Sequence, residues 1–97
     1  MAIKINPDYV KAHNNLGNVL RREGKNSEAI SHYKMAIKLK PDYDKAYNNL
    51  GAVLFADQKK EEAISHFKKA IELNPGFTAA QKNLETALRS MEIQDLF

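Results

Sequence analysis

The chain has 97 residues, enough for one small domain with a single hydrophobic core. Fifteen Lys and Arg against twelve Asp and Glu give a net charge of +3, which is far from the dense basic surface of nucleic-acid-binding proteins. Cysteine is absent, which excludes disulfide and thiolate chemistry, and no apolar run approaches the ~20 residues that span a bilayer.

An internal repeat of 34 residues organises the whole chain. Aligned without a gap, residues 10–43 and 44–77 are identical at 19 of 34 positions. The same frame continues into residues 1–9, where three residues match the end of the first copy: Ala2, Ile3 and Pro7 against Ala36, Ile37 and Pro41. It also continues into residues 78–97, where four residues match the start of the second copy: Ala80, Asn83, Leu84 and Leu88 against Ala46, Asn49, Leu50 and Leu54. We therefore expect one domain, 1–97, made of a repeat tail, two full repeats and a final segment.

Each repeat predicts two helices in succession. In residues 12–20 and again in 46–54, apolar side chains fall at helical spacing and form one stripe. Gly24 interrupts the pattern in the first copy, whereas Gln58 stands at that position in the second. A second stripe covers residues 29–39 and 63–73, and Pro41 or Pro75 follows it as a helix stop.

The conserved spacing of small and aromatic residues within the repeat resembles the tetratricopeptide repeat (TPR) family. The residues that carry the resemblance are Leu16, Gly17, Ala29, Tyr33, Ala36 and Pro41, then Leu50, Gly51, Ala63, Phe67, Ala70 and Pro75. The first aromatic position of the family pattern holds His13 and Tyr47, and its later tyrosine is replaced by leucine in both copies. The resemblance implies an all-α fold, a right-handed superhelix of antiparallel helix pairs (an α-solenoid).

The resemblance also implies that the first helix of each pair lines a concave surface. The candidate peptide-binding residues on that surface are Lys11, Asn14, Asn15, Asn18, Arg22, Lys45, Asn48, Asn49, Phe55, Lys82 and Asn83. Lysine and arginine there favour an acidic peptide, although the alternative is a solvated polar face. Phe55 fits a partner's apolar side chain, unless it packs on the adjacent helix pair.

Asparagine recurs at one position of every first helix, as Asn15, Asn49 and Asn83. Because an amide offers both a donor and an acceptor, such a row can hold the backbone of an extended peptide. The row resembles the asparagine ladder of TPR superhelices of the O-GlcNAc transferase type. The alternative is that these side chains bond to neighbouring helix ends or simply face water.

The carboxylate clamp of chaperone-binding TPR proteins is not predicted. That clamp uses a Lys, Asn, Asn, Lys, Arg set over three repeats. Asn18 and Asn49 match its asparagines, but Asn14, Ala79 and Asn83 stand where the three cations are required.

The final segment departs from the repeat. Glu85 takes the place of Gly51, so residues 78–97 predict a terminal capping helix or a truncated repeat. Its tail, MEIQDLF, is expected to fold back on the stack or to pack on another copy.

No catalytic or metal-binding motif is present. The three histidines are His13, His32 and His66, and we expect His32 and His66 on the outer surface rather than at a metal. The sequence therefore predicts no enzyme and no cofactor, but a scaffold that binds a protein or extended peptide. A self-assembly module that stacks through its ends is the alternative, and an RNA-binding array ranks last because a basic stripe is lacking. No membrane partner is expected. We expect a soluble, intracellular protein, although nothing in the sequence assigns a compartment.

Overall fold

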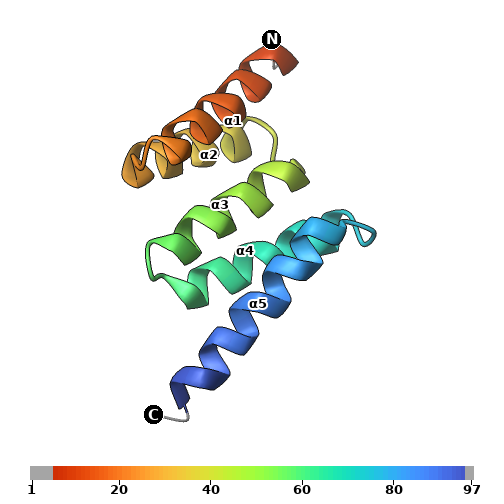
Figure 1. The fold of residues 1–97 in the computed structure, drawn as a ribbon. Coiled ribbons are helices and arrows are strands. Elements are labelled where there is room, and N and C mark those ends of the chain that lie inside the picture. The colour runs from red at the N-terminus through yellow and green to blue at the C-terminus, as the bar shows by residue number, and fades with distance from the viewer. Residues whose placement is uncertain (1–5, 96–97) are drawn as a thin grey trace.

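The computed structural model describes residues 6–95, which form five α-helices and, over that range, no strand. The helices are α1 (Pro7–Arg22), α2 (Asn26–Leu39), α3 (Asp44–Ala56), α4 (Lys60–Leu73) and α5 (Thr78–Asp95). They stack in chain order, so that the two ends of the chain lie at opposite ends of the array (Figure 1). α1 pairs with α2 and α3 with α4, and α5 packs against α4. The predicted all-α solenoid of antiparallel helix pairs is confirmed. None of the five helices is both long and apolar enough to cross a membrane.

Local sequence signals mark both ends of α1. The side chain of Asn6 accepts a hydrogen bond of 2.9 Å from the backbone N–H of Asp8, and Pro7 occupies the first turn of α1. Gly24 turns the chain between α1 and α2 with a φ of 78°, a conformation that glycine adopts freely. Gln58 takes the same left-handed conformation between α3 and α4, with a φ of 66°. In α5 the equivalent position is Glu92, and the helix continues through it.

One buried aromatic ring packs between the two helices of each pair. Tyr33 of α2 lies against Gly17 of α1, and Phe67 of α4 lies against Gly51 of α3. Both rings are almost fully buried. Because neither glycine carries a side chain, each ring rests directly on the backbone of the facing helix. The main core cluster joins both pairs to α5 and contains Leu20, Ala29, Tyr33, Leu50, Val53, Leu54, Ala63, Phe67 and Ala87.

The predicted apolar stripe is buried in the second repeat but only partly in the first. Leu50 and Val53 of α3 are 1% and 0% exposed, whereas their counterparts Leu16 and Val19 of α1 are each 43% exposed. The reason is that α3 packs against α2 as well as α4, while α1 has only α2 beside it in this part of the chain, apart from a small contact with α3.

Candidate functional site

A polar groove lies between α1 and α3, the first helices of the two repeats. It encloses about 420 Å³ and is lined by Lys11, Asn14, Asn15, Asn18, Tyr43, Lys45, Asn49 and Phe77. Side chains three, four and seven residues apart on α1 share one face, and repeat stacking places the equivalent face of α3 beside it. The structure therefore brings together six of the eleven residues that the sequence predicted.

Two lysines supply the positive charge of this groove. Lys11 and Lys45 stand at equivalent positions one repeat apart, and both are exposed. Neither of them belongs to an ion pair in the described part of the chain, where the bridges are Lys25–Glu23, Lys69–Glu72 and Arg89–Glu85. The groove therefore has cationic groups that are available to an anionic ligand.

Asparagine amides link the first helices to one another. Asn49 donates from Nδ2 to Oδ1 of Asn14 over 3.0 Å, and Asn83 donates in the same way to Asn48 over 2.9 Å. Asn14 and Asn48 are only 5% and 8% exposed, so these bonds satisfy buried oxygens. Of the six predicted asparagines, Asn14 and Asn48 therefore act mainly between helices, although Asn14 also lines the groove. Asn49 keeps its carbonyl oxygen and one N–H for other partners.

The side-chain amide of Asn18 is hydrogen-bonded to a buried residue of its own repeat. The buried hydroxyl of Tyr33 donates a hydrogen bond of 2.5 Å to Oδ1 of Asn18. Burial raises the pKa of the Tyr33 hydroxyl, against the opposing effect of the Arg21 and Arg22 cations. The hydroxyl therefore remains protonated at neutral pH and can act as the donor.

The groove is also lined by two aromatic residues that were not among the site residues predicted from the sequence. Tyr43 and Phe77 precede α3 and α5, and both are half-buried. Burial and the neighbouring carboxylate of Asp44 raise the pKa of Tyr43, while its hydrogen bond with Asn14 acts in the opposite direction. The signal was present, because Tyr9, Tyr43 and Phe77 are spaced by 34 residues.

The remaining predicted residues lie outside this groove. Phe55 lines a second hollow, of about 480 Å³, with Lys60, Thr86, Arg89, Ser90 and Ile93. Phe55 also packs against the core, as the alternative in the sequence analysis expected, while its contact with a partner's side chain stays a prediction. Arg22 and Lys82 are exposed and line neither hollow.

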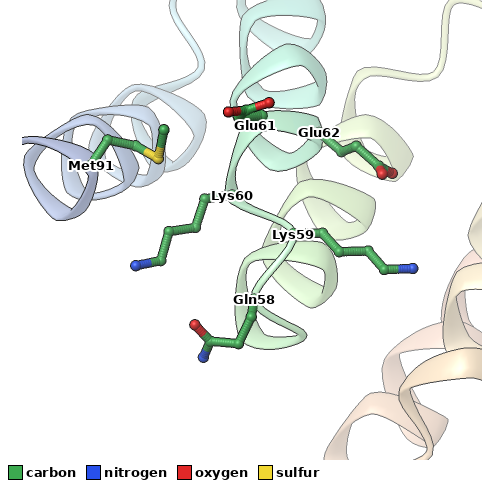
Figure 2. Close-up of a pocket in the computed structure, with 6 residues that line it drawn as sticks. All are labelled: Gln58, Lys59, Lys60, Glu61, Glu62 and Met91. Atoms are coloured by element: carbon green, nitrogen blue, oxygen red, sulfur yellow. The ribbon is translucent and has the colours of Figure 1, made fainter. Parts of the chain in front are cut away.

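A third hollow, of about 300 Å³, lies beside the start of α4. Figure 2 shows its lining residues, Gln58, Lys59, Lys60, Glu61, Glu62 and Met91. Their charges are of both signs, and the lysine and glutamate side chains point in different directions rather than toward one point (Figure 2). This arrangement offers no convergent set of groups to a ligand.

The histidines pair across the helices of each repeat. Nδ1 of His13 lies 3.1 Å from Nδ1 of His32, and the Tyr47 and His66 rings are 6.0 Å apart between centroids. The expectation that His32 and His66 lie on the outer surface is therefore wrong, because both are half-buried against a ring of the facing helix. Over residues 6–95 no three potential metal ligands come together.

Stacked antiparallel helix pairs with a polar groove along their first helices define a helical repeat protein of the solenoid class. Family models described as tetratricopeptide repeat match residues 1–31 and 44–77, and one described as TPR repeat matches residues 17–58. The chain belongs to the tetratricopeptide repeat family. No curated protein matches it in sequence.

Solved structures of TPR domains share this fold. The first TPR of Spaghetti (RPAP3), bound to the HSP90 peptide SRMEEVD, is 30% identical, with 90% of this chain and 71% of that chain covered and a TM-score of 0.84. The TPR2AB domain of yeast Sti1, in a complex with pHSP90, is 28% identical, with 90% of this chain and 34% of that chain covered and a TM-score of 0.86. The MamA protein is 28% identical, with 89% and 47% covered and a TM-score of 0.82.

Proposed function

We propose that this chain is a non-catalytic scaffold that binds an extended acidic segment of another protein in the groove between α1 and α3. The observation that carries the proposal is the convergence of Lys11 and Lys45 with the amides of Asn15, Asn18 and Asn49. Such a set of cations and amides recognises carboxylates and peptide backbone together.

In this proposal, each group of residues in the groove has a separate role in binding. Lys11 and Lys45 attract acidic groups, and their exposure makes that attraction sensitive to salt. Asn15 and Asn49 are available to the peptide backbone, since each retains unpaired amide groups. Tyr43 and Phe77 provide apolar walls beside the polar centre.

The proposal differs from the clamp of the chaperone-binding relatives in where the charge lies. Asn14, Ala79 and Asn83 stand where that clamp requires cations. The peptide SRMEEVD, which is bound in two structures of similar fold, is therefore a suitable acidic probe. In this chain, however, Lys11 and Lys45 would carry the charge recognition.

The test is fluorescence polarisation with labelled SRMEEVD and with a neutral counterpart, SQMQQVN carrying a C-terminal amide. We expect the acidic peptide to bind more tightly. Lys11→Ala/Lys45→Ala should weaken it about tenfold, because each exposed charge contributes up to about 1 kcal/mol. The matched control is Lys34→Ala/Lys68→Ala, which removes two exposed lysines from the second helices. Equal affinity for both peptides, or an equal loss in the control, would refute the proposal.

End-to-end self-association is a second candidate, favoured by one observation. Leu16 and Val19 of α1 are exposed, whereas their equivalents in α3, Leu50 and Val53, are buried because α3 packs against α2. Leu88 and Ile93 of α5 are exposed as well. The test is sedimentation equilibrium of the wild type and of Leu16→Ser/Val19→Ser. A monomer at all concentrations dismisses this candidate, whereas an oligomer that the substitutions dissociate supports it.

A further inference from the structure

The orientation of the Asn18 amide decides which hydrogen-bonding group this residue offers to the groove. An amide held through its oxygen turns its two N–H groups toward the ligand, whereas one held through its nitrogen presents an acceptor. The Tyr33 hydroxyl donates its hydrogen bond to Oδ1 of Asn18, and the amide oxygen is the group of this side chain that accepts from an O–H. The hydroxyl therefore holds the oxygen, and the Nδ2 hydrogens remain for a ligand.

The second repeat shows that packing alone does not require this hydroxyl. Phe67 replaces Tyr33 and lies against Gly51 as Tyr33 lies against Gly17. In the same repeat Ala52 replaces Asn18. The hydroxyl and the amide are thus present together in one repeat and absent together in the other, which indicates that they act as a pair.

The surroundings of Asn18 favour an anionic ligand. Lys11, two turns before it on α1, and Lys45 of α3 line the same groove as Asn18, so that cations stand on both helices beside it. A fixed amide donor between cations suits a carboxylate, which accepts hydrogen bonds at both oxygens, better than a carboxamide, which presents an N–H as well.

We propose that Tyr33, although it is fully buried, is the positioning residue that makes this groove prefer a carboxylate to a carboxamide, because it fixes Asn18 as a hydrogen-bond donor. The inference rests on the proposed function, since it concerns how the same groove distinguishes its ligands. Tyr33 itself does not touch the ligand. It acts only through Asn18, so its effect on selectivity has to disappear when Asn18 is removed.

The first experiment is a double-mutant cycle with Tyr33→Phe, Asn18→Ala and the combination, which reproduces the side chains of the second repeat. Each variant is measured with SRMEEVD and with the neutral SQMQQVN amide, and circular dichroism verifies that it is folded. We expect Tyr33→Phe to reduce the affinity ratio of the two peptides about three- to tenfold, as for one ordinary hydrogen bond whose geometry is loosened. In the Asn18→Ala background it should change the ratio no further. An equal loss for both peptides, or the same loss without Asn18, would overturn the inference.

A second measurement tests, without a peptide, whether the Tyr33 hydroxyl holds the side-chain amide of Asn18. The ¹⁵N order parameter of the Asn18 side-chain amide should fall on Tyr33→Phe, whereas that of Asn49 should not change. An unchanged Asn18 value would show that the hydroxyl does not hold the amide and would overturn the inference. If the wild type bound neither peptide, the proposed function would fail, and this measurement alone would decide whether Tyr33 orients Asn18.

Discussion

Gly17→Ala is the sharpest test of how the first repeat is packed. A Cβ atom at Gly17 would lie 2.6 Å from Cε1, 2.8 Å from Cδ1 and 2.9 Å from Cζ of Tyr33. Carbon atoms in contact normally lie about 3.5–4.0 Å apart, so the ring would have to withdraw by roughly 1 Å. Tyr33 is fully buried and hydrogen-bonded to Asn18, which leaves it little room to do so.

The expected size of the effect follows from opposing contributions. Replacing a helical glycine by alanine stabilises a helix by about 1 kcal/mol. Overpacking a close-packed core costs about 1–3 kcal/mol or more, and displacing the ring also weakens the bond to Asn18, which contributes about 1 kcal/mol. The net result is a loss of roughly 1–3 kcal/mol in the free energy of unfolding. For a domain of this size that lowers the melting temperature by about 5–20 °C.

The assay is thermal and urea unfolding followed by far-ultraviolet circular dichroism. Gly76→Ala is the matched control, because the nearest atom to its added Cβ would be Oδ1 of Asn74 at 4.0 Å. The control should change the stability by no more than about 0.5 kcal/mol. If Gly17→Ala unfolded at or above the wild-type temperature, helix propensity would outweigh the ring contact and the reasoning about packing would be refuted.

Further predictions concern the turn, the amide links and the buried histidine. Gln58→Gly should raise the stability by about 1 kcal/mol, because the left-handed φ of 66° strains a non-glycine residue; an unchanged urea midpoint would contradict this. Asn49→Ala should cost about 1–3 kcal/mol, since it leaves the buried oxygen of Asn14 without its donor, whereas Asn15→Ala should be nearly neutral. Equal urea midpoints for the two variants would show that the Asn14–Asn49 bond is unimportant. Burial lowers the pKa of His66 below its ordinary value of 6.5, so the unfolded chain binds the proton at higher pH. Stability should therefore be complete above about pH 7 and fall as the pH drops toward 5, and His66→Phe should flatten this dependence in urea titrations at several pH values.

Most of the fold follows from features that recur every 34 residues. The close approach of two helices needs a small residue opposite a large ring, so Gly17 with Tyr33 already indicates the pairing of the first repeat. Gly24 and Pro41 mark the ends of α1 and α2 in the same local way. The sequence left open whether residues 78–97 form a terminal helix or a truncated repeat; α5 continues past Glu92 to Asp95, since glutamate is compatible with a helix.

The candidate site was predictable where it depends on periodicity and not where it depends on distances between helices. Equivalent positions of stacked repeats lie side by side, which is why Lys11 and Lys45 meet in one groove. The bond between Asn49 and Asn14 joins two different repeat positions, so no comparison of equivalent residues reveals it. Asn15 and Asn49 are equivalent in the repeat. Within the described residues, however, only Asn49 lies beside the first helix of an earlier repeat, where the buried amide of Asn14 accepts its hydrogen bond.

The differences between the two repeats define the chemistry of the surface more than their similarities do. Arg21 of the first repeat corresponds to Phe55 of the second, and Asn18 corresponds to Ala52. The surface is therefore amide-rich and cationic along α1 and apolar toward the end of α3, where Phe55 and Ile93 line the second hollow. Under the proposed function, we expect a partner segment that spans both hollows to carry acidic groups over the groove between α1 and α3 and an apolar side chain over Phe55. Neither requirement follows from the family alone, because the shared repeat positions specify how helices pack while the differing positions specify what the packed surface can bind.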